Sequence, residues 1–299
     1  MKVSYLNDQF FSRLEALAFN LRSNLNGYFG GKHLVSTYGQ TVEFADYREY
    51  QLGDDIRRID WNLFSRFEKY FLKLFTDERQ MQVQIFLDCS ASMGKDNPQK
   101  SAFAVATAAA IGYLAVHNMD KVSFHLMKGN RAENPYGTII GKTPYFRAIG
   151  DIENINFVDD VDIENCVVSC PDTSSNNGLT VIISDFFTDS NWKKAVDYLC
   201  YKKRQVLLVQ IMTPDDADPA YDGHVTLIDS ESVDISDTKN MKMKITRGMQ
   251  KAYEEALKDF LLDIKSFCSK RGVDFITART DMAIEKVLFG ELLKVGILE

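Results

Sequence analysis

An aspartate and two serines alternate immediately after an apolar run in the segment IFLDCSASMG, residues 85–94. Asp88, Ser90 and Ser92 offer one carboxylate and two hydroxyls, a pattern that fits a nucleophile, a metal site or a turn that caps a helix. A second apolar run, LTVIISD, ends in Asp185. If the two runs are neighbouring parallel strands, these side chains meet at one edge of a sheet. Hard oxygen ligands of this kind suit Mg²⁺ or Mn²⁺.

Enzymatic chemistry fits the same residues less well. A phosphatase of the D-x-D type needs a second carboxylate at position 90, where this chain has serine. A serine hydrolase needs a histidine beside its nucleophile, and the segments that hold the histidines lie elsewhere in the pattern. We therefore expect a binding protein and no enzyme. A metal-assisted hydrolase or phosphatase that uses Asp88 and Asp185 is the alternative.

The elements that would position these residues alternate from about residue 80 in the manner of a parallel sheet with helices on both faces. We expect a doubly wound α/β fold, because several strand segments are apolar enough to be buried on both sides. Strands are expected at residues 83–88, 121–127, 179–185, 205–212 and 273–278, and helices at 98–118, 144–153, 161–169, 190–203, 247–270 and 281–289.

The N-terminal part has a different pattern. A helix is expected over residues 8–26, followed by a small β module, so the domains are predicted as 1–79 and 80–293, with a small insertion or hairpin at the sheet edge over 214–246. The passage YREYQLGDDIRRIDWNLFSRF, residues 47–67, mixes charges with aromatic residues. It suits either a structural network of arginine–carboxylate pairs or a partner-binding surface. The candidates for that surface are Asp54, Arg57, Arg58, Asp60 and Trp61.

Bulk composition narrows the function classes. The chain has 299 residues, 45% of them hydrophobic, which is enough for a large core, and a net charge of -7, which does not favour nucleic acid. Its five cysteines are scattered without a C-x-x-C pair, so we expect neither a disulfide framework nor a structural zinc site. The N-terminus does not resemble a signal peptide, and the uncharged segment 101–119 is expected to be a buried helix. We expect a cytoplasmic protein without membrane insertion.

The segment FLDCSASM resembles the metal-ion-dependent adhesion site of von Willebrand factor type A domains, which bind Mg²⁺ and an acidic partner residue. With the passage at 47–67, LKLFTDERQMQVQIFLDCSASM at 72–93 and VIISDFF at 181–187, the chain is similar to the bacterial domain-of-unknown-function family 58 from about Gly30 to Leu293. The resemblance implies a Rossmann-like type A domain with a metal site at Asp88, Ser90, Ser92 and Asp185, in which Asp185 matches the aspartate that usually reaches the metal through water.

The same resemblance implies a function. It points to a non-enzymatic adaptor in protein assembly, maturation or metal insertion, with Mg²⁺, or else Mn²⁺ or Ca²⁺, at the site. The implied partner is a MoxR-type AAA ATPase or another protein with an acidic ligand residue.

The chain departs from the type A pattern at one ligand. That pattern places a threonine in the loop that corresponds to NINFVDDVDIEN, residues 154–165, and this loop has none. Asp160 would add a negative charge and hold a divalent ion more firmly, whereas Val161 would remove a ligand and leave a degenerate site. Thr143 is an outside candidate, although its sequence context favours a helix N-cap followed by proline.

Overall fold

The computed structural model describes residues 5–15, 42–51, 54–77, 81–94, 97–157, 160–171, 178–188, 190–218, 223–227, 241–245, 247–284 and 286–287. The chain divides into two compact units. The large unit holds Met1–Leu21 and Met81–Glu299, and the small unit holds Arg22–Gln80.

A six-stranded sheet forms the centre of the large unit, in the order β10-β7-β6-β3-β4-β5. All neighbouring strands are parallel except the short edge strand β5, which the sequence did not predict. Strand β3 has β4 on one side and β6 on the other, so the winding of the chain reverses at β3. The expected doubly wound, mainly parallel α/β fold is therefore confirmed. The strands are β3 (Gln82–Asp88), β4 (Lys121–Lys128), β5 (Arg131–Glu133), β6 (Leu179–Ser184), β7 (Gln205–Met212) and β10 (Asp274–Arg279).

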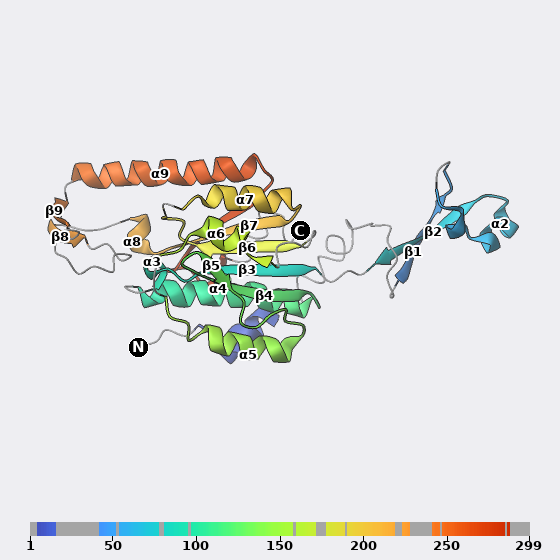
Figure 1. Cartoon of the computed structure of the whole chain (residues 1–299), viewed down its shortest axis with the longest axis horizontal. Coiled ribbons are helices and arrows are strands. Elements are labelled where there is room, and N and C mark those ends of the chain that lie inside the picture. The colour runs from blue at the N-terminus through green and yellow to red at the C-terminus, as the bar shows by residue number, and fades with distance from the viewer. Residues whose placement is uncertain are drawn as a thin grey trace. The chain divides into compact units, whose positions relative to one another are not determined.

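Helices cover both faces of this sheet (Figure 1). One face carries α4 (Pro98–His117) and α5 (Lys142–Ile152), and the other carries α6 (Ile163–Val168), α7 (Trp192–Tyr201) and α9 (Arg247–Ser269). Successive side chains of a strand point to opposite faces, so Ile85 and Leu87 of β3 enter one core and Phe86 enters the other.

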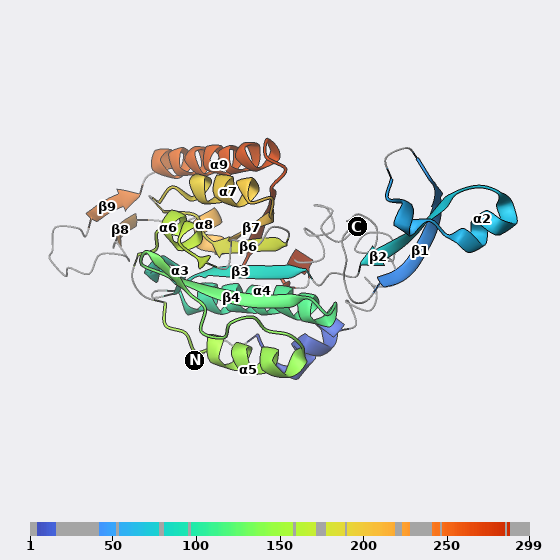
Figure 2. The same ribbon diagram turned by 45° about the vertical axis from the view of Figure 1, so that its right-hand side comes forward.

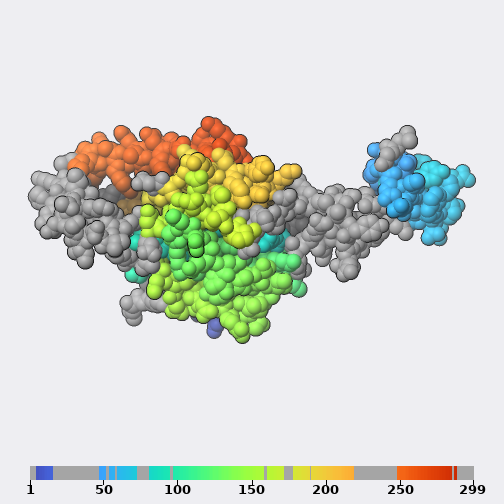
Figure 3. Space-filling view, in the orientation of Figure 1, coloured from blue at the N-terminus to red at the C-terminus, as the bar shows by residue number. Residues whose placement is uncertain are grey.

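Helices α7 and α9 run side by side over the second core (Figures 2 and 3). Two exposed ion pairs join them at their outer side, Lys193 to Asp263 at 2.6 Å and Arg271, just beyond α9, to Asp197 at 2.5 Å.

Helix α4 is the central helix of the other layer. The side chain of Asn97 caps its first turn, and Pro98 occupies the first helical position, where its missing N–H is not needed. By length and composition it is the one helix among the described residues that could cross a membrane, but 72% of its apolar window is buried inside the protein. The expectation of a buried core helix at this segment agrees with that burial.

The N-terminal helix differs from the expected organisation. Residues 8–15 are helical, and Phe10 and Leu14 are buried in the core that contains α4. The first 21 residues thus belong to the large unit, whereas the sequence placed them in a module of residues 1–79. The expected continuation of this helix to residue 26 lies outside the described residues.

The segment after β7 forms a short helix, α8 (Pro214–Ala217), and an antiparallel hairpin of β8 (Gly223–Leu227) and β9 (Met241–Ile245). The hairpin is a two-stranded sheet of its own and does not extend the main sheet. The expected helix at 281–289 is represented by the helical residues 284, 286 and 287.

The small unit is an antiparallel pair of β1 (Val42–Glu49) and β2 (Phe71–Asp77), joined through a 3₁₀ turn, Ile56–Arg58, and helix α2 (Trp61–Phe67). The sequence predicted the β element and did not predict α2.

Candidate functional site

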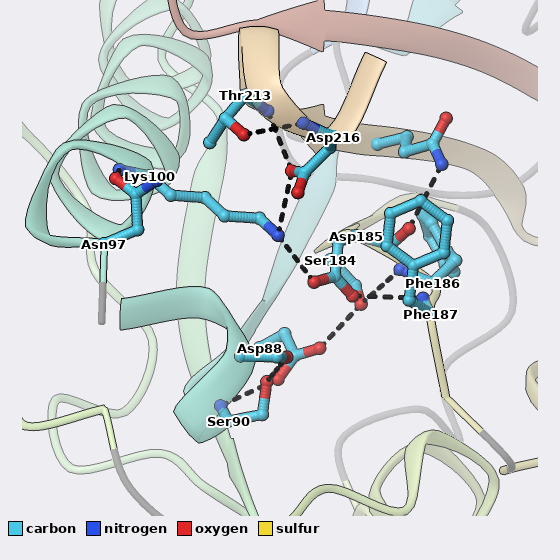
Figure 4. Close-up of polar contacts among 12 residues, drawn as sticks. Asp88, Ser90, Asn97, Lys100, Ser184, Asp185, Phe186, Phe187, Thr213 and Asp216 are labelled. Carbon is cyan, nitrogen blue, oxygen red and sulfur yellow. Dashed lines mark hydrogen bonds and ion pairs between the residues drawn. The ribbon is translucent and has the colours of Figure 1, made fainter. Parts of the chain in front are cut away.

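The two aspartates singled out by the sequence lie at the same edge of the main sheet. Asp88 ends β3, Asp185 directly follows β6, and these strands are parallel neighbours. In open α/β sheets the crevice for ligands forms at the carboxyl ends of strands where the winding reverses, which here is between β3 and β6. Both side chains are buried, with 3% of Asp88 and 2% of Asp185 exposed. Figure 4 shows the two carboxylates and their partners.

The carboxylate of Asp88 is oriented by two hydrogen bonds. Its Oδ1 accepts from the backbone N–H of Ser90 at 2.9 Å, and its Oδ2 accepts from the hydroxyl of Ser184 at 2.6 Å. The hydroxyls of Ser90 and Ser92 lie 3.0 Å apart at the start of the short helix α3 (Ala91–Gly94). Each carboxylate oxygen keeps a lone pair beyond these bonds, so one carboxylate and two hydroxyls are available to a cation.

Burial changes the acidity of this carboxyl. The pKa of Asp88 is raised from 3.8 to about 6, mainly by loss of solvent and to a smaller extent by the charge of Asp185. The hydrogen bonds from Ser184 and Ser90 oppose this rise. Asp88 therefore carries a charge near neutral pH that water does not stabilise. A cation at this position would be attracted to it.

Lys100 is a site residue that the sequence analysis missed. Its ammonium is 2.7 Å from Oδ2 of Asp185 and 3.3 Å from Oδ2 of Asp216 on α8 (Figure 4). Burial alone would lower the pKa of Lys100, but the charges of Asp185 and Asp216 outweigh burial and raise it. A signal was present, because a lysine in the first turn of an apolar helix opposes the helix dipole and needs a compensating partner.

Asp185 is held on both carboxylate oxygens. Its Oδ1 accepts from the backbone N–H of Phe187 at 3.0 Å, while its Oδ2 accepts from Lys100. The backbone of Phe186 has a positive φ of 59°, and its N–H donates to the hydroxyl of Ser184. Because of this tight turn, Ser184 contacts Asp88 while the next residue, Asp185, contacts Lys100.

The loop that should supply the missing ligand passes beside α3. Phe157 packs so closely on Gly94 that a β-carbon there would lie 2.6 Å from Phe157, and Val161 pairs with Gly129 just after β4. Val161 is a buried core residue. Asp160 is exposed, and its Oδ1 accepts from the backbone N–H of Val161 at 2.7 Å.

The expectation that Thr143 caps a helix is wrong. The N-cap of α5 is Gly141, whose φ of 85° favours glycine, and the helix already begins at Lys142. Thr143 therefore lies inside the first turn.

The donor set at Asp88, Ser90 and Ser92 fits a hard divalent cation, because all its atoms are oxygen and only one carries charge. Asp185 fits less simply, since an internal ammonium already occupies one of its oxygens. Within the described part of the chain, no group of three or more His, Cys, Asp or Glu side chains could hold a metal ion. The serines are thus essential to any metal site here, and the ligand role of Asp160 stays a prediction.

Two aspartates of the charged passage stabilise the small unit itself. Asp54 accepts hydrogen bonds from the backbone N–H of Gln51 and from Arg48, each at 2.8 Å. Both bonds lower the pKa of Asp54, and the bond from Gln51 has the larger effect. Asp60 is buried, caps α2 and accepts from the hydroxyl of Tyr47 at 3.2 Å. Their contacts are those of a structural network.

Trp61 has a different environment. It is 59% exposed and lies edge-on to Phe64 and Tyr70, which stack on each other at 4.6 Å. Arg57 is exposed nearby in the sequence, and the side chain of Arg58 lies outside the described residues. An exposed tryptophan on an aromatic base is typical of a protein-binding surface.

The sequence matches the family model described as "Protein of unknown function DUF58" over residues 46–259, which include parts of both units. Uncharacterized proteins of Mycobacterium tuberculosis and Mycobacterium bovis are 27% identical to it over 224 residues, which is 73% of this chain and 70% of each relative. The match confirms the family that the motifs indicate.

Two solved structures are similar to the chain. The conserved hypothetical protein BatB from Bacteroides thetaiotaomicron has a TM-score of 0.43 at 14% identity, over 73% of this chain and 99% of that chain. A von Willebrand factor type A protein from Catenulispora acidiphila has a TM-score of 0.32 at 13% identity, over 46% of this chain and 34% of that chain.

Proposed function

The chain belongs to the DUF58 family of bacterial proteins of unknown function, and we propose that it is a non-enzymatic interaction protein that binds a divalent cation at Asp88, Ser90 and Ser92. The observation that carries this proposal is the meeting of a buried, charged Asp88 with two hydroxyls at the β3/β6 switch point. Mg²⁺ is the first candidate, and Mn²⁺ and Ca²⁺ bind similar oxygen sets.

The neutral hydroxyls explain why such a site would bind a partner. Ser90 and Ser92 contribute oxygens without charge, so a cation held there keeps part of its positive charge. A carboxylate from another protein can then complete the coordination. When bound, the ion would supply this electrostatic attraction, while the chain supplies a preorganised carboxylate and two hydroxyls.

For the partner we propose a MoxR-type AAA ATPase, with the chain acting as its adaptor in protein assembly or maturation in the cytoplasm. The aromatic surface of Trp61, together with Arg57, is the second contact that we propose. Its support is the exposure of Trp61, because tryptophan and arginine contribute most strongly to binding when a partner covers them.

Calorimetric titration with Mg²⁺ and Mn²⁺ tests the metal site. We expect saturable binding to the wild type and its loss in Asp88→Asn, which keeps the shape of the side chain and removes its charge. Asp120→Asn is the matched control, since Asp120 is also buried but lies at the opposite end of the strands. Absence of binding to the wild type would exclude the site, and turnover of a simple phosphoester with Mg²⁺ would favour the hydrolase alternative.

Pull-down against a MoxR-type AAA ATPase from the same organism tests the adaptor role. Asp88→Asn and removal of Mg²⁺ should each weaken the interaction by about tenfold or more, and Trp61→Ala should weaken it by roughly thirtyfold, the effect of an interface hot spot. Tyr201→Ala is the control, because Tyr201 is 80% exposed on α7. An interaction that is indifferent to both site changes would show that neither surface is the contact.

A further inference from the structure

Lys100 is a buried cation next to Asp185, at the carboxyl ends of the strands that carry the proposed metal site. Only 5% of its side chain is exposed, and its ammonium lies between Asp185 and Asp216. The ring of Phe187 is 6.0 Å from the ammonium and covers it on one side. Three separate elements therefore converge on one buried charge, the start of α4, the turn after β6 and helix α8.

This placement opposes the usual preferences of a lysine. The N-terminal turn of a helix is a region of positive potential, and burial removes the water that normally stabilises an ammonium. Exposed lysines are also found in this unit, such as Lys193 in its pair with Asp263. Lys100 is held in place by Asp185 and Asp216, so its charge acts mainly on those two carboxylates.

We propose that Lys100 is a positioning residue that sets the affinity of the Asp88 site for divalent cations. It does so by holding Asp185 away from direct coordination, because the ammonium occupies Oδ2 of that carboxylate. The inference rests on the proposed metal site and deepens it.

Two substitutions should change the affinity in opposite directions. Lys100→Met removes the positive charge and frees Asp185, so Mn²⁺ should bind about tenfold more tightly or better. Asp216→Asn removes one of the two carboxylates that share the ammonium, so Lys100 should hold Asp185 more firmly and Mn²⁺ should bind more weakly, by roughly threefold. Lys100→Arg keeps the charge and should stay close to the wild type.

Mn²⁺ titration of the full chain, followed by calorimetry and by the electron paramagnetic resonance of free Mn²⁺, measures these affinities. Asp215→Asn is the matched control for Asp216→Asn, because it removes the same charge from an exposed position on the same helix. Lys193→Met is the control for Lys100→Met. Both controls should leave the affinity unchanged within about twofold, since exposed charges are screened by solvent.

A double substitution tests whether Lys100 acts through Asp185. The gain from Lys100→Met should disappear in an Asp185→Asn background, an outcome that a general change of packing would not produce. The inference is overturned if Lys100→Met binds Mn²⁺ no more tightly than the wild type, or if the gain persists without Asp185.

Three further outcomes keep this inference distinguishable from the proposed function. If Lys100→Met does not fold, the comparison of Asp216→Asn with Asp215→Asn decides, and equal affinities overturn the inference. If neither the wild type nor a folded Lys100→Met binds Mn²⁺, both proposals fail. Binding by Lys100→Met alone would support the role of Lys100 and refute a metal site in the natural chain.

Discussion

The two ends of the main sheet hold buried charges in different ways. At the carboxyl ends of the strands, Lys100 is paired with the carboxylates of Asp185 and Asp216. At the amino ends, the guanidinium of Arg204 donates to the backbone carbonyls of Gln82 and Leu179 and to a threonine hydroxyl. The first end thus joins charged side chains from separate elements, and the second ties a charge to the starts of neighbouring strands.

The pKa values of Lys100 and Arg204 reflect the different partners at the two ends. Carboxylates raise the pKa of Lys100 despite its burial, whereas the neutral partners of Arg204 cannot offset burial, which lowers its pKa to about 10. Gly178 belongs to the same arrangement at the amino ends, since a β-carbon there would collide with the carbonyl of Gln82 and crowd Arg204. Bonds to backbone fix the strand register, while bonds between side chains can be exchanged for a ligand. The carboxyl ends are therefore where function is expected.

The largest expected effect is on stability without metal. Lys100→Met leaves Asp185 as a buried charge that has lost its main partner, which should lower the free energy of unfolding by about 3–5 kcal/mol. Urea unfolding in chelator measures this loss. Excess Mn²⁺ should then restore part of it, because a cation again lies beside Asp185.

The exposed pair of Lys193 and Asp263 provides the contrast for that experiment. Lys193→Met should cost less than about 1 kcal/mol, with or without Mn²⁺. If Lys100→Met is as stable as the wild type in chelator, the pair at the carboxyl ends contributes no more than a surface pair, and the contrast between the two ends of the sheet is lost.

A smaller loss is expected at the amino ends. Arg204→Met removes hydrogen bonds to two strand starts and should lower the free energy of unfolding by about 2–4 kcal/mol. Mn²⁺ should not restore it, because the partners of Arg204 are neutral and its removal leaves no buried carboxylate for a cation to pair with. Recovery of Arg204→Met in Mn²⁺ equal to that of Lys100→Met would show that the ion acts on the whole protein and not at one end of the sheet.

Sequence could predict that Asp88 and Asp185 lie close together, because apolar β-branched runs in alternation with helices define a parallel sheet and place both strand ends at one edge. It could not predict the pairing of Lys100 with Asp185 and Asp216. Asp185 is 85 positions further along the chain and Asp216 is further still, so no local pattern links the three residues. The folded chain brings the turn after β6 and helix α8 to the start of α4, and only this placement reveals the two contacts.

Local signals also failed where backbone conformation decided the outcome. The context of Thr143 favoured a cap, but Gly141 adopts the positive φ that lets the chain enter α5 earlier. The N-terminal helix was assigned to the wrong unit because its pattern records an apolar face and not the surface that covers it, which is the core around α4.

The smallest effect concerns a buried carboxyl at the amino ends. Burial raises the pKa of Asp120 from 3.8 to about 6, and its Oδ1 accepts from the backbone N–H of Met81 at 2.8 Å. The folded state therefore binds a proton more tightly than the unfolded state. The stability that this proton contributes is complete below pH 3.8 and is lost as the pH rises towards 6.

Asp120→Asn should remove the loss of stability that occurs as the pH rises. Asparagine keeps the acceptor for the N–H of Met81 and carries no charge. The variant should unfold with a free energy about 1–2 kcal/mol higher than the wild type at neutral pH, and the difference should vanish near pH 4. Urea unfolding of both proteins across this range measures it. Other buried carboxyls such as Asp88 titrate equally in both proteins, so they cancel in the comparison. A difference that is independent of pH would mean that the variant acts through packing, and the amino ends would then hold no uncompensated charge to contrast with the pair at Lys100.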